Sequence, residues 1–305
     1  MNVSHDSIGV STGQASAVRH DDGRRGSPFA RAGVPMGMMS FWRAVRRGDR
    51  YPGLIKLAKG LVGVGVCVVL WEMVRALGLI DARDLPAFGA VIRTFVREIA
   101  GGPLLAAVIA SISSWAPGLL VAAVTGTVGG VALAMLPGLE IATRPLLEFL
   151  RPIPSVALIP IALLTLGIGA EMQLTMIAFA SVWPVLFSVK AGVESVDPRF
   201  LETGRVFGLQ SFSQVLRIVM PSALPSMATG LRTASAIALV LTITVEMLTG
   251  RPGIGRYIED VRLNGLVTEM WAAIFATGVL GYAVNGGMLM IERRLLPWSA
   301  ENRES

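Results

Sequence analysis

The chain contains little charge and almost no cysteine. Charged residues make up 16% of its 305 residues, compared with about 25% in soluble domains. Cys67 is the only cysteine, which excludes an intramolecular disulfide, a four-cysteine zinc site and a CxxC redox pair. The two histidines, His5 and His20, lie outside every apolar stretch. We therefore expect no metal site in the apolar part of the chain.

Lysine is also scarce, and this bears on nucleotide chemistry. A phosphate-binding P-loop requires Gly-Lys followed by Ser or Thr after a glycine-rich turn. The lysines are Lys56, Lys59 and Lys190; none follows a glycine, and none precedes Ser or Thr. We therefore expect that this chain is not an enzyme, has no ATPase site, binds no cofactor and has no nucleic-acid partner.

Long apolar runs dominate the rest of the sequence. Apolar residues make up 53% of the chain, and the stretches 99–139, 152–170, 172–189 and 270–291 contain no Asp, Glu, Lys or Arg. A helix needs about 20 mostly apolar residues to cross the hydrocarbon core of a bilayer. The sequence therefore predicts an all-α polytopic membrane protein in contact with lipid.

The apolar pattern predicts about six transmembrane helices, at approximately 57–80, 104–136, 153–167, 172–193, 221–248 and 270–295. They would form a transmembrane domain over 57–298, followed by a cytoplasmic tail over 299–305. Residues 1–56, rich in Gly, Ser, Asp and Arg, are expected to form a disordered basic cytoplasmic tail. The stretch FWRAVRRGDR at its end either binds anionic headgroups or serves as a positive flank that fixes orientation.

Small residues and basic residues add two further predictions. Cytoplasmic loops retain an excess of Lys and Arg, and most of the 27 basic residues fall on one side if both termini are cytoplasmic. Small residues within spans indicate close helix packing. They occur here as a GxxxG pair and as a glycine group in the last span: Gly126 and Gly130, then Gly278, Gly281, Gly286 and Gly287.

A charged amphipathic segment, residues 197–221, separates two apolar spans. Asp197 followed by Pro198 predicts a helix start, because the carboxylate can accept a first-turn N–H and proline suits the first helical position. Gly208 predicts the end of that helix, since glycine readily adopts the left-handed conformation of a C-terminal cap.

A second short helix is predicted to follow. Ser211 and Gln214 have the spacing of a capping box, and Pro221 is expected to end the helix and open the next span. The helix would carry one apolar face, made by Phe212, Val215, Leu216 and Val219. The helix pair is interpreted either as a rigid lever for a partner, which would contact Glu202, Arg205 and Arg217, or as an interfacial helix on lipid headgroups.

Segment 197–221 resembles the EAA loop of ATP-binding-cassette importer permeases, whose pattern is E-A-A-x3-G-x9-I-x-L-P. The matching positions are Glu202, Thr203, Gly204, Gly208, Ile218 and Pro221. The resemblance implies that these residues, together with Arg205, couple the chain to an ATPase; we call residues 197–221 the coupling segment. Gly204 departs most from the pattern, because glycine weakens a helix by about 1 kcal/mol relative to alanine. It would loosen the docking surface or admit a partner side chain.

Three further stretches, 150–169, 220–238 and 245–258, resemble the nitrate, alkanesulfonate, taurine and bicarbonate branch of that family. This resemblance implies a permease in a bacterial inner membrane that imports a small anionic solute by alternating access. It also implies a second permease copy, forming a homodimer, cytoplasmic ATPase subunits that use the ATP, and an extracytoplasmic solute-binding protein.

Two rival classes of function remain open at this point. An ion-coupled carrier would use membrane carboxylates, for which Glu72 and Glu246 are the candidates. Glu72 is followed three residues later by Arg75, which favours a structural ion pair. Glu246 lies near the outer end of its span and is either part of a pathway or gate, or a solvated helix end. A scaffold without transport activity is the third class.

Candidate pathway residues are the polar side chains of the last two spans. Arg232 either attracts an anionic solute or extends to the membrane interface. Thr242, Thr244 and Asn285 either line the path or bond to neighbouring helices, and Glu246, with the alternatives given above, completes the candidates.

Overall fold

The computed structural model describes residues 52–81 and 83–296, and that part of the chain is helical without strands. The all-α prediction is therefore confirmed. The chain divides into two units, residues 1–65 and 66–305, and helix α2 (Pro52–Ala76) crosses the division. The second unit contains all the later helices. The predicted tails lie outside the described residues, apart from the start of α2.

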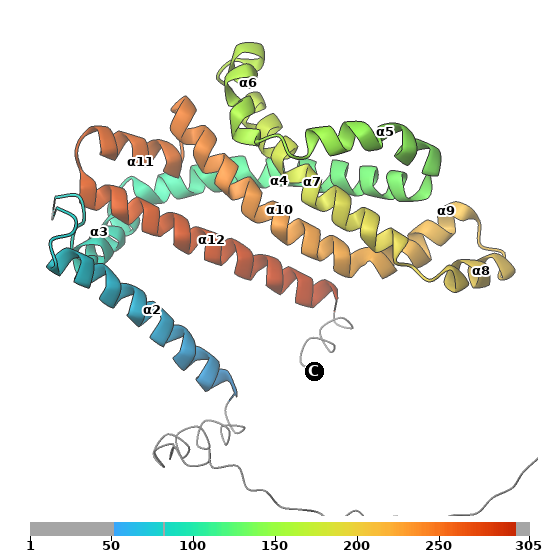
Figure 1. Ribbon diagram of the computed structural model, residues 1–305, viewed down its shortest axis with the longest axis horizontal. Coiled ribbons are helices and arrows are strands. Elements are labelled where there is room, and N and C mark those ends of the chain that lie inside the picture. The colour runs from blue at the N-terminus through green and yellow to red at the C-terminus, as the bar shows by residue number, and fades with distance from the viewer. Residues whose placement is uncertain (1–51, 82, 297–305) are drawn as a thin grey trace, which may run out of the picture. The chain divides into compact units, whose positions relative to one another are not determined.

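The helices of the second unit are joined by short connections (Figure 1). They are α3 (Phe88–Gly101), α4 (Leu104–Met135), α5 (Pro137–Leu150), the 3-10 turn η1 (Ser155–Leu158), α6 (Ile159–Leu166), α7 (Ala170–Glu194), α8 (Pro198–Val206), α9 (Ser211–Gln214), the π-helical turn η2 (Val215–Val219), α10 (Met220–Thr249), α11 (Ile254–Leu263) and α12 (Val267–Leu295).

Four helices among the described residues are long and apolar enough to cross a membrane. They are α4, α7, α12 and the continuous helix Ser211–Thr249, which joins α9, η2 and α10. A fifth crossing is possible if α5 and the η1–α6 pair, which are bent by 86°, form one broken span. The count of six stays a prediction.

The third span predicted over 153–167 is not one continuous helix, in agreement with the three prolines within and beside it. Within it, α6 has only eight residues, which at 1.5 Å per residue is about 12 Å. Pro154 adopts an extended backbone and is followed by the 3-10 turn η1, so the α-helix begins only at Ile159, with Pro160 in its first turn. The apolar run is therefore divided between a turn and a short helix.

Glycines allow α4 to pack closely on α7. A Cβ atom added at Gly118, Gly126 or Gly130 of α4 would overlap side chains of α7, namely Ile177, Val185 and Val189. The predicted packing role of the GxxxG pair is confirmed. The glycines of α12 differ, because Gly278, Gly286 and Gly287 have no described atom within 4 Å of an added Cβ. For these three no helix among the described residues packs closely, and their packing role stays a prediction.

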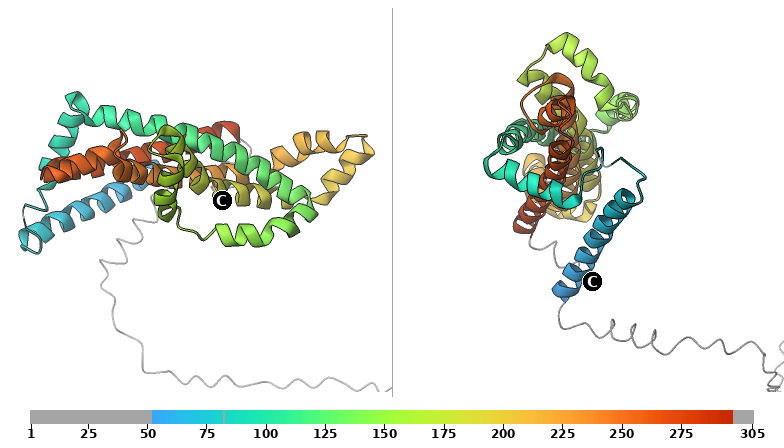
Figure 2. Two further views of the ribbon diagram at one scale, coloured as in Figure 1. Left: turned by 90° about the horizontal axis from the view of Figure 1, so that it is seen from above. Right: turned by 90° about the vertical axis from the view of Figure 1, so that its left-hand side faces the viewer.

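Helix α10 contributes to all three apolar clusters of the unit. One cluster joins it to α4 and α7, one to α3, α4, α11 and α12, and one to α6 and α7. The coupling segment lies at one end of the long helices and α3 and α11 lie at the other (Figure 2). Helix α10 runs between these two ends (Figure 1).

Glu72 makes two contacts at the turn between α2 and α3. Its Oε2 lies 3.6 Å from Arg75 Nη1, which confirms the predicted ion pair. Its Oε1 also accepts the backbone N–H of Phe88 at 2.8 Å. Glu72 thus caps the first turn of α3 from a neighbouring helix, which is a structural role.

Candidate functional site

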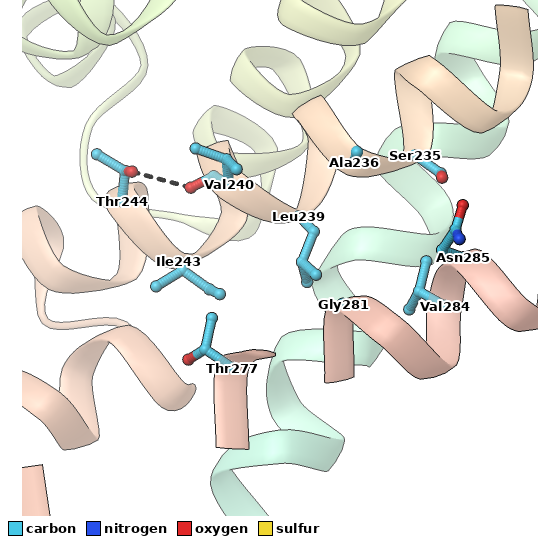
Figure 3. Close-up of a pocket in the computed structure, with 10 residues that line it drawn as sticks. All are labelled: Ser235, Ala236, Leu239, Val240, Ile243, Thr244, Thr277, Gly281, Val284 and Asn285. Atoms are coloured by element: carbon cyan, nitrogen blue, oxygen red, sulfur yellow. Dashed lines mark hydrogen bonds between the residues drawn. The ribbon is translucent and has the colours of Figure 1, made fainter. Parts of the chain in front are cut away.

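A groove of about 480 Å³ lies between α10 and α12 (Figure 3). Most of its wall is apolar, and a few polar groups are spaced along it. Its lining consists of Ser235, Ala236, Leu239, Val240, Ile243 and Thr244 of α10, and Thr277, Gly281, Val284 and Asn285 of α12. We call this the α10–α12 groove.

The hydroxyl groups in the groove are oriented by their own helices. Ser235 Oγ donates to the Arg232 carbonyl at 2.7 Å, Thr244 Oγ1 to the Val240 carbonyl at 2.8 Å (Figure 3), and Thr277 Oγ1 to the Ala273 carbonyl at 3.0 Å. Their protons are therefore engaged, while their oxygen lone pairs remain able to accept. The Asn285 amide supplies donors on the opposite wall (Figure 3).

The structure places only some of the predicted pathway residues in this groove. Thr244 and Asn285 line it. Thr242 is fully buried, and its hydroxyl donates to the Ala238 carbonyl at 2.7 Å, which is the helix-bonding alternative. Thr242 and Thr244 differ because residues two apart on a helix point to different sides.

Arg232 forms an ion pair rather than lining the α10–α12 groove. Its Nη1 lies 3.7 Å from Glu292 Oε2, and the Glu292 side chain is only 8% exposed. The pair joins α10 to α12 toward the end of the unit that carries the coupling segment. Sequence reasoning did not identify Glu292, although it directly follows the uncharged run 270–291.

Glu246 is fully buried at the other end of α10. Its Oε2 accepts the Ser111 hydroxyl of α4 at 2.8 Å and the Gly255 N–H of α11 at 3.0 Å. Ser111 Oγ in turn accepts the Ile254 N–H at 2.9 Å. Glu246 is therefore neither a solvated helix end nor part of the groove lining. We call these four residues, Ser111, Glu246, Ile254 and Gly255, the Glu246 clasp.

A second buried contact lies beside the clasp. Gln173 of α7 is 1% exposed, and its Oε1 accepts Arg251 Nε at 2.7 Å. The loop between α10 and α11 is thus held by α4 and by α7. Sequence reasoning missed Ser111 and Gln173, and the only available signal was a polar residue inside an uncharged run.

Helix α11 also makes a polar contact with α3. Tyr257 donates its hydroxyl to Glu98 Oε2 at 3.2 Å. Burial and the nearby Glu98 carboxylate raise the pKa of Tyr257 to about 12. The phenol therefore stays protonated as a donor throughout the physiological range.

The first half of the coupling segment folds as its sequence predicts. Asp197 caps α8 by accepting the Arg199 N–H at 2.9 Å. Helix α8 ends before Gly208, whose φ is +75°. Gly208 N–H bonds to the Arg205 carbonyl and Leu209 N–H to the Gly204 carbonyl, both at 2.9 Å. This pair of bonds is a Schellman motif.

Gly204 has a packing role within the chain. It is buried, and an added Cβ would lie 2.9 Å from Ile218 Cδ1 and 3.4 Å from Leu209 Cδ1. The space that glycine leaves is filled by the second half of the coupling segment. It does not form an exposed notch for a partner side chain.

Two predictions for the second half are wrong. Ser211 is the first residue of α9 rather than its cap, and no side chain caps that end; Gln214 Nε2 instead donates to the Leu209 carbonyl at 3.0 Å. Pro221 does not end the helix. Before it, Met220 N–H bonds to the Val215 carbonyl, five residues back, and this π-helical turn widens the backbone ahead of the proline ring.

The surface of the coupling segment combines exposed aromatic and charged side chains. Phe207 is 81% exposed and Phe212 is 77% exposed. Among the residues predicted to couple, Gly204 is buried and Ile218 is half-buried, while the others are exposed: Glu202, Thr203, Arg205, Gly208 and Pro221. The predicted apolar face is divided, since Val219 is buried and Leu216 is exposed.

Four long apolar helices and a mostly apolar groove with a few polar groups are typical of a helical membrane protein. The chain belongs to the family of binding-protein-dependent transport system inner membrane components, whose pattern matches residues 118–297. It is therefore a permease of the ATP-binding-cassette importer type, as its sequence predicted.

Several proteins of known name resemble the chain. It is 28% identical to the aliphatic sulfonates transport permease protein SsuC of Bacillus subtilis over 240 residues, covering 79% of this chain and 87% of SsuC. It is 29% identical to the bicarbonate transport system permease protein CmpB of Synechocystis sp. (85% and 93% covered). It is 25% identical to the taurine transport system permease protein TauC of Escherichia coli (83% and 94% covered).

A solved structure shares the fold. The inward-facing MetNI methionine ABC transporter contains a chain that superposes with a TM-score of 0.56 at 18% identity, covering 63% of this chain and 95% of that chain. At this identity the likeness extends to the fold only.

Proposed function

We propose that this permease imports a small anionic solute of the sulfonate, taurine, nitrate or bicarbonate type, driven by ATP hydrolysis in a separate subunit. The solute class is supported by the names of the similar permeases. The observation that carries the mechanism is the continuous helix Ser211–Thr249, because it joins the coupling segment to the α10–α12 groove. A force applied at one end of this helix moves the groove wall directly.

The coupling segment is the proposed docking surface for the ATPase subunit. Exposed aromatic side chains such as Phe207 and Phe212 supply apolar anchors, which dominate the energy of protein interfaces. Glu202, Arg205 and Arg217 supply exposed charges around them. ATP is bound by that subunit, and the permease itself binds no cofactor.

The α10–α12 groove is the proposed wall of the translocation path, with a second copy of the permease supplying the opposite wall. Thr244 and Asn285 are the pathway contacts. Gly278, Gly286 and Gly287 of α12 leave space beside the groove, where a neighbouring helix can approach closely. The mass of the detergent-solubilised permease, measured by light scattering, should be that of two copies.

The proposed docking of the ATPase subunit also gives the orientation of the permease in the membrane. The end with the coupling segment faces the cytoplasm, in agreement with the excess of Lys and Arg on that side, and both termini are cytoplasmic. The end with α3 and α11 faces outward, where the solute-binding protein delivers the solute. The protein is thus a multi-pass protein of the bacterial inner membrane.

Uptake into proteoliposomes tests the proposed function. The permease is reconstituted with its ATPase subunit and solute-binding protein, and taurine, ethanesulfonate, nitrate and bicarbonate are offered as solutes. We expect uptake that requires ATP and the ATPase subunit. Uptake driven by an imposed proton or sodium gradient without ATP would instead establish an ion-coupled carrier, and no uptake under either condition would leave the scaffold class.

A further inference from the structure

The Glu246 clasp joins three elements through one buried carboxylate. Ser111 belongs to α4, Glu246 to α10, and Ile254 and Gly255 begin α11. The first N–H groups of a helix have no partner within the helix, and here the side chains of two other helices accept them at 2.9 and 3.0 Å. The start of α11 is therefore fixed by hydrogen bonds to α4 and α10.

The backbone around the carboxylate leaves no free space. A Cβ atom added at Gly253 would overlap the Glu246 carboxylate, and one added at Gly255 would overlap the Ile243 carbonyl and Glu246 itself. Glu246, Ser111 and Ile254 are each fully buried. A carboxylate enclosed in this way cannot turn aside without moving α11.

Glu246 lies near one end of the continuous helix Ser211–Thr249, and the last part of the coupling segment forms the other end. The continuous helix Ser211–Thr249 has 39 residues, which corresponds to about 60 Å. The groove residues Ile243 and Thr244 lie less than one turn from Glu246. Displacement of α10 at the coupling segment therefore reaches α11 and α4 through the Glu246 carboxylate.

We infer that Glu246 is a positioning residue that makes α11 and the outer part of α4 move together with α10, so that ATP-driven motion reshapes the outer end of the α10–α12 groove. The role rests on the proposed function. Glu246 contacts neither the solute nor the ATPase. Loss of Glu246 would uncouple ATP hydrolysis from solute movement. The helix Ser211–Thr249 would still move at the coupling segment, but α11 and α4 would no longer follow its outer end.

The test is the number of solute molecules imported per ATP hydrolysed. This ratio does not depend on how much protein folds, because misfolded permease removes uptake and hydrolysis in proportion. The complete transporter is reconstituted in proteoliposomes with taurine, ethanesulfonate, nitrate and bicarbonate as solutes. The variants are Glu246→Leu, which removes the acceptor, Glu246→Gln, which keeps one acceptor oxygen, and Ser111→Ala, a milder loss of the same bonds.

We expect Glu246→Leu to lower the ratio by about fivefold or more, as for the loss of coupling between distant sites, and Ser111→Ala to lower it by a smaller factor, with ATP hydrolysis per active transporter nearly unchanged in both. Glu246→Gln should retain most of the ratio. The matched control is Glu171→Leu, which removes an exposed carboxylate from the first turn of α7 and should leave the ratio unchanged.

An unchanged ratio in both Glu246→Leu and Ser111→Ala would overturn the inference while leaving the proposed function intact. If uptake and hydrolysis also fell in proportion, the clasp would only stabilise the fold. Absence of ATP-dependent uptake in the unaltered transporter would instead overturn the proposed function, and the inference with it.

Discussion

At the scale of single residues, buried polar side chains make the most specific contacts of the permease. Glu246, Ser111 and Gln173 expose 1% or less of their surface, and each polar group left without a partner there would cost about 1–3 kcal/mol. Glu246 was predictable as a special position, because a carboxylate at the end of an apolar run is visible in the sequence. Ser111 and Gln173 were not, since a hydroxyl or amide in such a run gives no sign of which helix it faces.

The pathway candidates illustrate the same difficulty. Thr242 and Thr244 have the same chemistry and lie two residues apart, yet only Thr244 lines the α10–α12 groove. Helical geometry predicts that they face different sides. The sequence does not say which side is the core, because α10 is apolar on nearly every face. Arg232 likewise could not be assigned until Glu292 was located beside it.

Gly255→Ala should destabilise the permease. An added Cβ would overlap the Ile243 carbonyl, which is backbone and cannot rotate away, so α11 must shift. We expect a loss of about 1–3 kcal/mol, as for overpacked cores, seen as a lower melting temperature in detergent. The matched control is Gly138→Ala in α5, an exposed position where an added Cβ meets no described atom within 4 Å. Equal melting temperatures for the two variants would contradict the close packing at the clasp.

At the scale of elements, some features of the coupling segment depend on neighbouring residues in the sequence, and others depend on tertiary packing. The start of α8 at Asp197 and its end near Gly208 were predicted correctly, because caps depend on a few neighbouring residues. The capping box at Ser211 and the helix end at Pro221 were not. The chain there continues into α10 through a π-helical turn, and the burial of Val219 in the α4–α7–α10 cluster favours that continuity over a local break.

Phe207→Asp should weaken binding of the ATPase subunit. Replacing an exposed aromatic anchor with a carboxylate removes apolar contact area from the proposed docking surface. We expect an affinity about tenfold lower or worse, as at interface hot spots, measured between the detergent-solubilised permease and its ATPase by biolayer interferometry. Phe207→Leu should retain much of the affinity.

The control for this prediction is Gln210→Asp, which adds the same charge to an exposed position of the same corner without removing apolar surface. It should bind nearly as well as the unaltered permease. Equal losses for Phe207→Asp and Gln210→Asp would show that charge alone matters, and no loss for either would remove Phe207 from the docking surface.

At the scale of the whole molecule, helix α10 organises the permease. It contributes to the three apolar clusters of the described residues, continues from the coupling segment, and forms one wall of the α10–α12 groove and part of the Glu246 clasp. The membrane class, the all-α fold and the family could be predicted from composition and motifs. The number of crossings could not, because hydropathy does not distinguish a straight span from the bent α5 and η1–α6 pair. Prolines near that bend interrupt the helix, and their effect depends on backbone geometry rather than on hydropathy.

Cross-linking of the coupling segment to the ATPase tests the central claim most directly. In a Cys67→Ser background, Phe207→Cys introduces one exposed thiol, and Tyr282→Cys introduces another at a side chain that is 83% exposed on α12. A thiol-to-amine cross-linker is applied to the complete transporter in membranes. The account predicts a permease–ATPase adduct from position 207 and none from position 282. An intact transporter that yields no adduct from position 207 would contradict it.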